Sequence, residues 1–409
     1  MVNSSSDTDP VGQLTEQGGL ADGPMVVTGM QTILKTKVPQ RNFDLSNALQ
    51  RTARARGISQ LRLAAEIIKA SRGRQRLGWK EYFLYGAHQP GLTPEQRAEF
   101  LGDSVTRAMN LALKPKPNGL GGLFTDKVLT DLLLTRCGLP VAPIRAVASQ
   151  VRLGGPYPVL HGQQELERFL AGTELPVFGK PAHGSRSVGA ISILAREGAT
   201  LVLGDGTRVD ISSLADEILR YFPASYVFQD LMLPHPDLEQ IVGPVISSVR
   251  VVTLRIDGEV VPLYAAMKMP GKGQMVDDIA SFINTLCSID HRTGKILRGQ
   301  DARRLGGTDM AVNPVTGYSL AGAQIPHWPE VMQLAHDVHE VFSQQGLKCI
   351  DVAVTPSGPR IIELNGSPQH GFYQKVFARG FWNPEIAPLM TAALAGCGHR
   401  QATKDLPYP

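Results

Sequence analysis

The chain has 409 residues, of which 43% are hydrophobic and 19% charged, and this composition is typical of a folded protein with two or three domains. The net charge of +4 is too small by itself to indicate a nucleic-acid partner, and no apolar run approaches the roughly 18–20 residues of a membrane-spanning helix. The four cysteines form no Cys-x-x-Cys pair, which predicts neither a zinc site nor a disulfide framework. We therefore expect a protein of the reduced cytoplasm without a membrane anchor.

The chain changes character near residue 26. Residues 1–25 are rich in serine and glycine, and we expect a tail without fixed structure. Residues 26–114 predict a basic helical region, because apolar residues recur at helical spacing and residues 31–90 hold twelve Lys or Arg against three Asp or Glu. These charges either bind an anionic partner, such as a phosphorylated substrate or an RNA end, or form the solvated face of a helical cap. The second interpretation is favoured.

A helix is expected over residues 93–113, with Pro94 in its first turn. The Pro- and Gly-rich residues 115–122 then predict a domain boundary. Beyond it, residues 125–143 predict a helix that carries Lys127 and ends at a glycine, followed by an extended strand. A single lysine on a helix is often only a surface charge.

A second signal lies in residues 175–194. They predict a strand that ends in Lys180, a loop of small residues with Gly184, Ser185 and Ser187, and a second strand. Small residues let backbone N–H groups come close to phosphate oxygens, while the lysine adds a positive charge. The loop matches neither a Walker P-loop nor a Gly-x-Gly-x-x-Gly turn.

Two later strands each carry a basic residue. Residues 247–254 alternate as a strand containing Arg250, Asp257-Gly258 predicts a hairpin turn, and the returning strand ends in Lys268. Without further context, Arg250 and Lys268 are compatible with ordinary cross-strand charges on an exposed sheet face. Before these two strands, residues 226–239 predict a strand that runs into a loop. After them, the chain continues to an amphipathic helix over residues 328–345.

Residues 346–368 predict a β-hairpin with three oxygen-bearing side chains, Asp351, Glu363 and Asn365. Glu363 and Asn365 are two apart on one strand and face the same side, and Asp351 on the partner strand can join them. Carboxylate and amide oxygens suit Mg²⁺, although a strand end, a turn cap and a solvated charge would explain the same residues. His370 follows directly and could line an acceptor pocket, but a packing or turn role is more common.

From about residue 120 to about residue 396, these ordered motifs resemble the ATP-grasp superfamily, in particular its sugar-transfer-associated branch and, more distantly, D-alanine:D-alanine ligase. The resemblance implies an α+β fold in which two lobes clasp ATP, with a small lobe over residues 120–232 and a C-terminal lobe over residues 233–400. It also implies Mg²⁺, with Mn²⁺ as an alternative, on Asp351, Glu363 and Asn365.

The resemblance assigns nucleotide-binding roles as well. It implies that Lys127 and Lys180 contact phosphates and that the loop of Gly184, Ser185 and Ser187 forms a flexible lid. Its adenine-reading connector corresponds to Gln229, Asp230, Leu231 and Met232, although Met232 would equally suit a packed core. The ribose-binding acid would be Asp237 or Glu239. Arg250 and Lys268 take the positions of the two cations at the transferred phosphate.

The implied reaction is ATP-dependent ligation of a small-molecule carboxylate to an amine through an acyl phosphate, with ADP and phosphate released, in the biosynthesis of a small metabolite or of a cell-surface or sugar conjugate. The alternatives are a kinase acting on a hydroxyl group and a non-catalytic ATP-binding module. Where the branch commonly shows Val-Asp-Asn and a glycine pair, this chain has Val276-Asp277-Asp278 and no glycines, so the second substrate does not follow from the resemblance. We expect no nucleic-acid or membrane partner, and a homodimer stays open.

Overall fold

The computed structural model describes residues 32–34, 43–114, 121–184, 187–277, 285–301 and 308–396, and the structural statements below refer to them. The chain divides into two units, Met1–Thr32 and Ile33–Pro409, and every helix and strand below belongs to the second. Within the described part, no helix has both the length and the apolar character needed to cross a membrane. Of the cysteines in this part, Cys137 is exposed, Cys287 and Cys349 are buried, and all three are free thiols.

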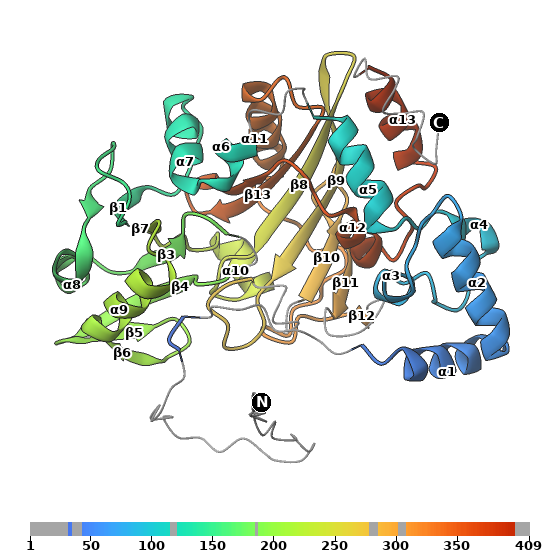
Figure 1. Cartoon of the computed structure of the whole chain (residues 1–409), viewed down its shortest axis with the longest axis horizontal. Coiled ribbons are helices and arrows are strands. Elements are labelled where there is room, and N and C mark those ends of the chain that lie inside the picture. Colours follow the sequence, from blue (N-terminus) through green and yellow to red (C-terminus); the bar gives the residue numbers. More distant parts are fainter. Residues whose placement is uncertain are drawn as a thin grey trace, which may run out of the picture. The chain divides into compact units, whose positions relative to one another are not determined.

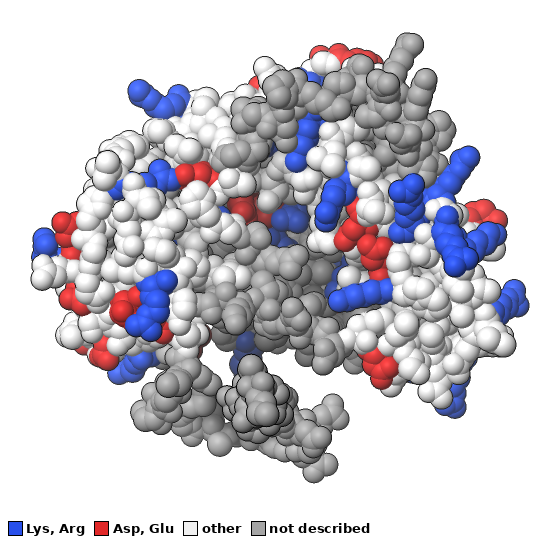
Figure 2. Space-filling view, viewed as in Figure 1, with Lys and Arg blue, Asp and Glu red and all other residues white. Residues whose placement is uncertain are grey.

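Five described helices form the N-terminal region. They are α1 (Leu45–Arg56), α2 (Gln60–Arg72), α3 (Trp79–Leu84), α4 (Pro94–Ala98) and α5 (Asp103–Ala112) (Figure 1). The side chains of Asp44 and Ser59 accept hydrogen bonds from backbone N–H groups in the first turns of α1 and α2, and so fix where these helices begin. Buried Leu63, Ile67 and Phe83 form the core between them. Several lysine and arginine side chains project from the outer surface of this region (Figure 2).

The single helix predicted over residues 93–113 is wrong, because the chain turns between α4 and α5. The side chain of Gln75 donates hydrogen bonds to the carbonyl oxygens of Arg97 at 2.6 Å and Phe100 at 2.9 Å. Phe100 is fully buried at this turn. A Cβ atom on Gly102, the residue before α5, would lie 2.1 Å from the carbonyl oxygen of Arg76, so this close approach requires glycine.

The first sheet has seven described strands in the order β2-β1-β7-β3-β4-β5-β6. Their bounds are β1 (Ile144–Ala148), β2 (Val159–Leu160), β3 (Val177–Pro181), β4 (Ile191–Glu197), β5 (Thr200–Leu203), β6 (Arg208–Asp210) and β7 (Tyr226–Asp230). The accompanying helices are α6 (Gly121–Thr125), α7 (Lys127–Arg136), α8 (Gly162–Gly172) and α9 (Ile211–Tyr221). Apolar side chains of α8 and α9, among them Leu166, Leu214 and Ile218, pack against the sheet.

The second sheet also has seven described strands, in the order β12-β11-β10-β9-β8-β13-β14. Their bounds are β8 (Ser248–Ile256), β9 (Glu259–Met269), β10 (Thr285–Ile289), β11 (Ile296–Asp301), β12 (Asp309–Met310), β13 (Leu347–Thr355) and β14 (Gly358–Asn365). Its helices are α10 (Pro236–Val242), α11 (Trp328–Val341), α12 (His370–Phe377) and α13 (Ile386–Gly396). The pairing of β8 with β13 joins segments about 100 positions apart in the chain, as in Arg250 opposite Asp351.

Helices cover both faces of the second sheet. Val331 and Val338 of α11 pack against the face that carries Val251, whereas α5, α12 and α13 pack against the face that carries Leu254 (Figure 1). The alternation along each strand therefore sorts the side chains of β8 and β13 into two buried layers. This arrangement confirms the predicted α+β class with a helical N-terminal region. The predicted domain limits at residues 26–114, 120–232 and 233–400 stay predictions.

Candidate functional site

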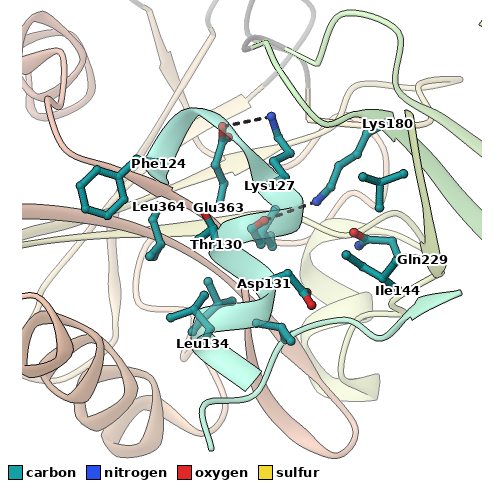
Figure 3. Close-up of a pocket in the computed structure, with 14 residues that line it drawn as sticks. Phe124, Lys127, Thr130, Asp131, Leu134, Ile144, Lys180, Gln229, Glu363 and Leu364 are labelled. Atoms are coloured by element: carbon teal, nitrogen blue, oxygen red, sulfur yellow. Dashed lines mark hydrogen bonds and ion pairs between the residues drawn. The ribbon is translucent and has the colours of Figure 1, made fainter. Parts of the chain in front are cut away.

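A pocket lies where α6, α7, β1, β3, β7 and β14 meet (Figure 3). It therefore draws on both sheets. The polar side chains that line it are Lys127, Thr130, Asp131, Lys180, Gln229 and Glu363. The apolar side chains are Phe124, Leu134, Val141, Ile144, Val227, Ile361, Ile362 and Leu364.

One face of α7 forms a wall of this pocket. Lys127, Thr130, Asp131 and Leu134 are spaced at i, i+3, i+4 and i+7, so their side chains share one side of the helix. The start of α7 is fixed by Asp126, whose carboxylate accepts hydrogen bonds from the backbone N–H of Val128 at 2.9 Å and of Leu129 at 3.3 Å.

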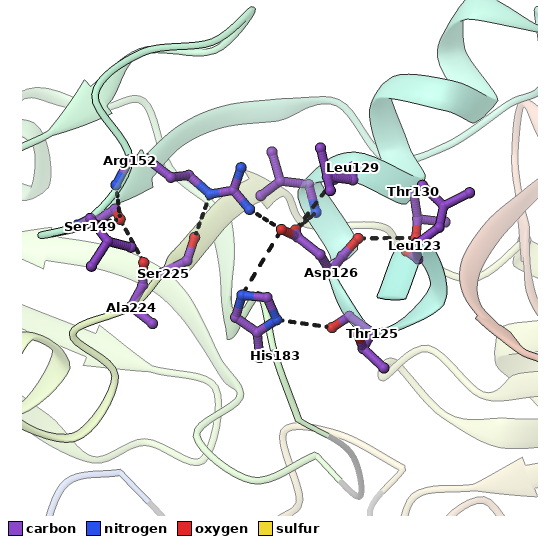
Figure 4. Close-up of polar contacts among 12 residues, drawn as sticks. Leu123, Thr125, Asp126, Leu129, Thr130, Ser149, Arg152, His183, Ala224 and Ser225 are labelled. Atoms are coloured by element: carbon purple, nitrogen blue, oxygen red, sulfur yellow. Dashed lines mark hydrogen bonds and ion pairs between the residues drawn. The ribbon is translucent and has the colours of Figure 1, made fainter. Parts of the chain in front are cut away.

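The cap of α7 is tied to the first sheet. Arg152 pairs with Asp126, and the Nε2 atom of His183 lies 3.9 Å from the same carboxylate (Figure 4). The hydroxyl group of Thr130 donates to the carbonyl oxygen of Leu123 at 2.6 Å, which links α7 back to α6. These contacts hold the pocket face of α7 in place relative to the loop that follows β3.

Lys127 connects three elements at one end of the pocket. Its ammonium group donates a hydrogen bond to the carbonyl oxygen of Gly184 at 2.9 Å and lies 3.8 Å from Oε1 of Glu363 (Figure 3). Gly184 has φ of 125°, which suits a glycine in the loop after β3. Ser187, in the same loop, has φ of 56°, whereas Ser185 lies outside the described residues.

Lys180 projects from β3 into the pocket. Its Nζ atom lies 3.5 Å from the carbonyl oxygen of Ile362, and it forms no ion pair with another described residue. Burial and, to a smaller extent, the positive charge of Lys127 together lower the pKa of Lys180 to about 8, against the opposing effect of Glu363 and Asp131. Two ammonium groups and one accessible carboxylate thus meet at this end of the pocket.

Gln229 and Asp131 come from facing elements, β7 and α7. The side chain of Gln229 lines the pocket although the residue is only 5% exposed. The hydroxyl group of Tyr157 donates a hydrogen bond to the carboxylate of Asp131. Burial raises the pKa of Asp131, whereas the hydrogen bond from Tyr157 and the charge of Lys180 oppose this rise.

The other residues of the predicted connector do not line the pocket. Asp230 pairs with Arg145, and Leu231 and Met232 follow β7 as half-buried residues. The two predicted ribose-binding acids, Asp237 and Glu239, are exposed in the first turn of α10 and are also absent from the lining.

A second group of charges lies on the face of the second sheet that α12 covers. The Nε and one terminal nitrogen of Arg250 each donate to a carboxylate oxygen of Asp351 at 2.8 Å. The Nζ atom of Lys268 lies 3.3 Å from Oδ2 of Asp351 and 3.5 Å from Oδ2 of Asp277. The guanidinium carbon of Arg250 lies 5.2 Å from the ring centre of Phe372.

This group is buried and internally paired. Asp351 is 2% exposed, and although burial favours its neutral form, Arg250 and Lys268 hold the pKa of Asp351 well below its usual range. Burial raises the pKa of Asp277, despite the nearby charge of Lys268. Asp277 serves here as a partner of Lys268, whereas Asp278, which stands where the expected Val-Asp-Asn pattern has Asn, lies outside the described residues.

The three predicted metal ligands share one face of the second sheet. Asp351 is paired directly with Glu363, and Asn365 lies two residues further along β14. Among the described residues, no group of three His, Cys, Asp or Glu side chains is arranged to hold a metal ion. Glu363 and Asn365 nevertheless fit a hard divalent cation, because both offer oxygen atoms and the Glu363 side chain is 28% exposed. Asp351 would have to share its oxygens with Arg250 and Lys268.

His370 has a packing role in the structure. Its Nε2 atom lies 2.9 Å from Oδ1 of Asn110 in α5, and its Nδ1 atom lies 3.4 Å from the hydroxyl group of Tyr264. Nε2 therefore donates and Nδ1 accepts, which is the neutral imidazole. Burial lowers the pKa of His370 to about 3. The residue joins the N-terminal helices to the second sheet.

Thr130 and Asp131 were not predicted as site residues. Their spacing from Lys127 was a usable signal, since i+3 and i+4 on a helix share the side of position i. Tyr157 and Ile361 carried no such signal, because only the packing of distant segments brings them here. The structure brings Lys127, Lys180, Gln229 and Glu363 together in the pocket and places Arg250, Lys268 and Asp351 in the second group.

The sequence profile of a family described as sugar-transfer associated ATP-grasp matches residues 106–384. No curated protein sequence matches the chain. Among solved structures, the chain is similar to D-alanine–D-alanine ligase from Bacillus anthracis, with 12% identity, a TM-score of 0.37, and coverage of 69% of this chain and 70% of that one.

Two further solved structures are similar to the chain. For the VanG D-Ala:D-Ser ligase from Enterococcus faecalis, identity is 12%, the TM-score is 0.41, and coverage is 68% of this chain and 63% of that one. For an ADP complex of N5-carboxyaminoimidazole ribonucleotide synthetase, identity is 12%, the TM-score is 0.36, and coverage is 62% of this chain. The chain spans only 48% of the length of that synthetase.

Proposed function

The chain belongs to the sugar-transfer associated ATP-grasp family, and from that premise we propose that it is an ATP-dependent ligase that joins a small-molecule carboxylate to an amine. The observation that carries this proposal is the meeting of Lys127, Lys180 and Glu363 in one pocket. Two ammonium groups suit the phosphates of a nucleotide, and the loop of Gly184 lies within hydrogen-bond reach of Lys127.

In the proposed reaction, a carboxylate oxygen of the acid attacks the γ-phosphorus of ATP, the bond to the β–γ bridging oxygen breaks, and ADP leaves. The amine nitrogen then attacks the carbonyl carbon of the acyl phosphate, inorganic phosphate leaves, and the nitrogen loses a proton to solvent. Lys127 and Lys180 orient the phosphates, which lowers the entropic cost of the first step. This proposal needs no nucleophile from the protein.

Arg250 and Lys268 are proposed to stabilise the negative charge of the transferred phosphate. Asp351 uses two of the five N–H donors of Arg250, so three remain for a ligand. Glu363 and Asn365, with Asp351, would hold Mg²⁺ or Mn²⁺, and such an ion would neutralise part of the phosphate charge. The position of Asp351 between its two cations keeps them fixed while the phosphate binds.

The proposal is tested by measuring ADP and phosphate release from Mg²⁺-ATP with pools of amino acids, hydroxy acids and amino sugars, with and without hydroxylamine. Hydroxylamine traps acyl phosphates as hydroxamates. We expect turnover that needs a carboxylic acid, yields a hydroxamate and is lost in Glu363→Gln, whereas Glu259→Gln, a change of an exposed acid at the start of β9, should leave it intact.

Three results would contradict the proposal. Wild-type turnover in Glu363→Gln would exclude Glu363 as a ligand of the site. ADP formation without phosphate or hydroxamate would indicate a kinase that phosphorylates a hydroxyl group. ATP binding without turnover in any pool would indicate a non-catalytic ATP-binding module.

A further inference from the structure

The pocket has a polar end and a largely apolar end. Lys127 and Glu363 mark the polar end, and Asp131 lies one helical turn further along α7, about 5–6 Å away at the helix surface. Beyond Asp131 the wall of α7 continues with Leu134, and Ile144 of β1 lies across from it (Figure 3). A nucleotide whose phosphates meet the lysines would place its flat apolar base toward Leu134 and Ile144, and this inference rests on the proposed function.

Asp131 and Glu363 are the two carboxylates among the described residues that line the pocket. Glu363 is engaged with Lys127 at the polar end. The acids predicted for the nucleoside, Asp237 and Glu239, lie exposed in α10 and do not reach the lining. Asp131 is therefore the carboxylate available to the nucleoside.

The carboxylate of Asp131 is held in one orientation. Tyr157 donates a hydrogen bond to Oδ2, and Thr135, one turn along α7, also hydrogen-bonds the side chain. A carboxylate has about four acceptor positions, so these two bonds leave room for a ligand donor. A half-buried and oriented acceptor discriminates between ligands more strongly than a mobile surface charge, because an unmatched ligand leaves it unpaired.

Gln229 faces the same space from β7 and differs from Asp131 in one respect. An amide can rotate to donate or to accept, so Gln229 can pair with an amino group or with a carbonyl group. An ionised carboxylate can only accept. We propose that Asp131 is the residue that selects adenine, by accepting a hydrogen bond from the exocyclic 6-amino group.

The test uses nucleotide binding, because binding requires no acid substrate. Dissociation constants of the full chain are measured with Mg²⁺ for ADP, for IDP, which carries a 6-carbonyl group, and for 2′-deoxyADP. A hydrogen bond to a charged group contributes about 1.5–3 kcal/mol, so the wild type should prefer ADP over IDP by roughly 10- to 100-fold. Asp131→Asn should nearly abolish this preference, since an amide can accept from the 6-amino group of ADP or donate to the 6-carbonyl group of IDP.

Asp131→Ala provides a second variant. It should also lose the preference for ADP over IDP, and it should bind ADP more weakly than the wild type does. Glu259→Gln, which changes an exposed acid at the start of β9, is the matched control and should keep this preference. An equal loss of affinity for ADP and IDP would overturn the inference, because it would mean that Asp131 only positions Lys180. A loss confined to the difference between ADP and 2′-deoxyADP would overturn it in favour of ribose binding. If the wild type binds no nucleotide, the proposed function itself fails.

Discussion

Two groups of charges in the molecule differ in how far they are already neutralised. In the Arg250 group, Asp351 is 2% exposed and receives two hydrogen bonds of 2.8 Å from one guanidinium. In the pocket, the Glu363 side chain is 28% exposed, and its contact with Lys127 is 3.8 Å long. The charges of the first group are paired closely with one another, whereas the second group holds its charges loosely and suits a ligand that brings negative charge.

The pKa values express the same difference. Burial acts on Asp351 and on Lys180, but Asp351 has two cations beside it, and these hold its pKa well below the usual range. No carboxylate of a described residue contacts Lys180, and burial together with the charge of Lys127 lowers its pKa to about 8. A bound phosphate would supply the negative charge that the pocket lacks. The comparison therefore supports the proposal that Lys180 binds a phosphate group.

The largest effect is expected from Asp351→Asn, which would leave Arg250 and Lys268 buried without their shared carboxylate. Removing one partner of a buried ion pair costs about 3–5 kcal/mol, and urea unfolding monitored by circular dichroism measures this loss of the free energy of unfolding. Glu363→Gln is the matched change in the looser group and should alter stability by only about 0.5 kcal/mol, because a long and partly exposed ion pair contributes little. Equal losses of the free energy of unfolding for Asp351→Asn and Glu363→Gln would contradict the difference in charge pairing between the two groups.

A smaller effect is expected from Lys180→Met, measured as the dissociation constant of Mg²⁺-ADP. The loss of one charged hydrogen-bond donor should weaken binding by roughly 10- to 100-fold. In the wild type, Lys180 is protonated below its pKa of about 8 and loses its charge above it, so affinity should fall as the pH rises through 8. The variant should lack this dependence. Lys80→Met, on the exposed surface of α3, is the control, and a pH profile that Lys180→Met leaves unchanged would contradict the assignment.

The smallest effect is expected on the basic surface of α2. Arg62 and Lys69 are exposed and form no ion pair with a described residue. Reversing both charges to Glu should change stability by no more than about 0.5 kcal/mol and leave ATP turnover unchanged, because isolated surface charges contribute little. Thermal unfolding and the ADP-release assay check this. Loss of turnover at unchanged stability would instead support the alternative that these helices bind an anionic substrate.

Some of the site follows from local sequence. The hairpin of β13 and β14, with Asp351 opposite Glu363 and Asn365 two residues on, could be predicted because strand alternation and a Pro- and Gly-rich turn are local properties. Lys127 on a helix and Lys180 on a strand were equally visible, and the structure places both in one pocket. The α+β class was implied by the resemblance of these ordered motifs to the ATP-grasp superfamily.

Non-local pairing decided the rest. Asp351 meets Arg250 only because β8 and β13 pair in one particular register, and the spacing within either strand does not reveal it. The break between α4 and α5 depends on the side chain of Gln75, which lies more than twenty residues upstream.

By itself, the sequence determined the hairpin of β13 and β14 and the charges that each predicted element carries, but not the break between α4 and α5. Tertiary structure decided which charges are neutralised by a neighbour and which remain for a ligand, as in Asp351 beside Arg250 and Asp131 facing Gln229. The physical reason is that secondary structure follows from periodicity and backbone preferences within a few residues. Burial and charge pairing instead depend on which distant elements pack together.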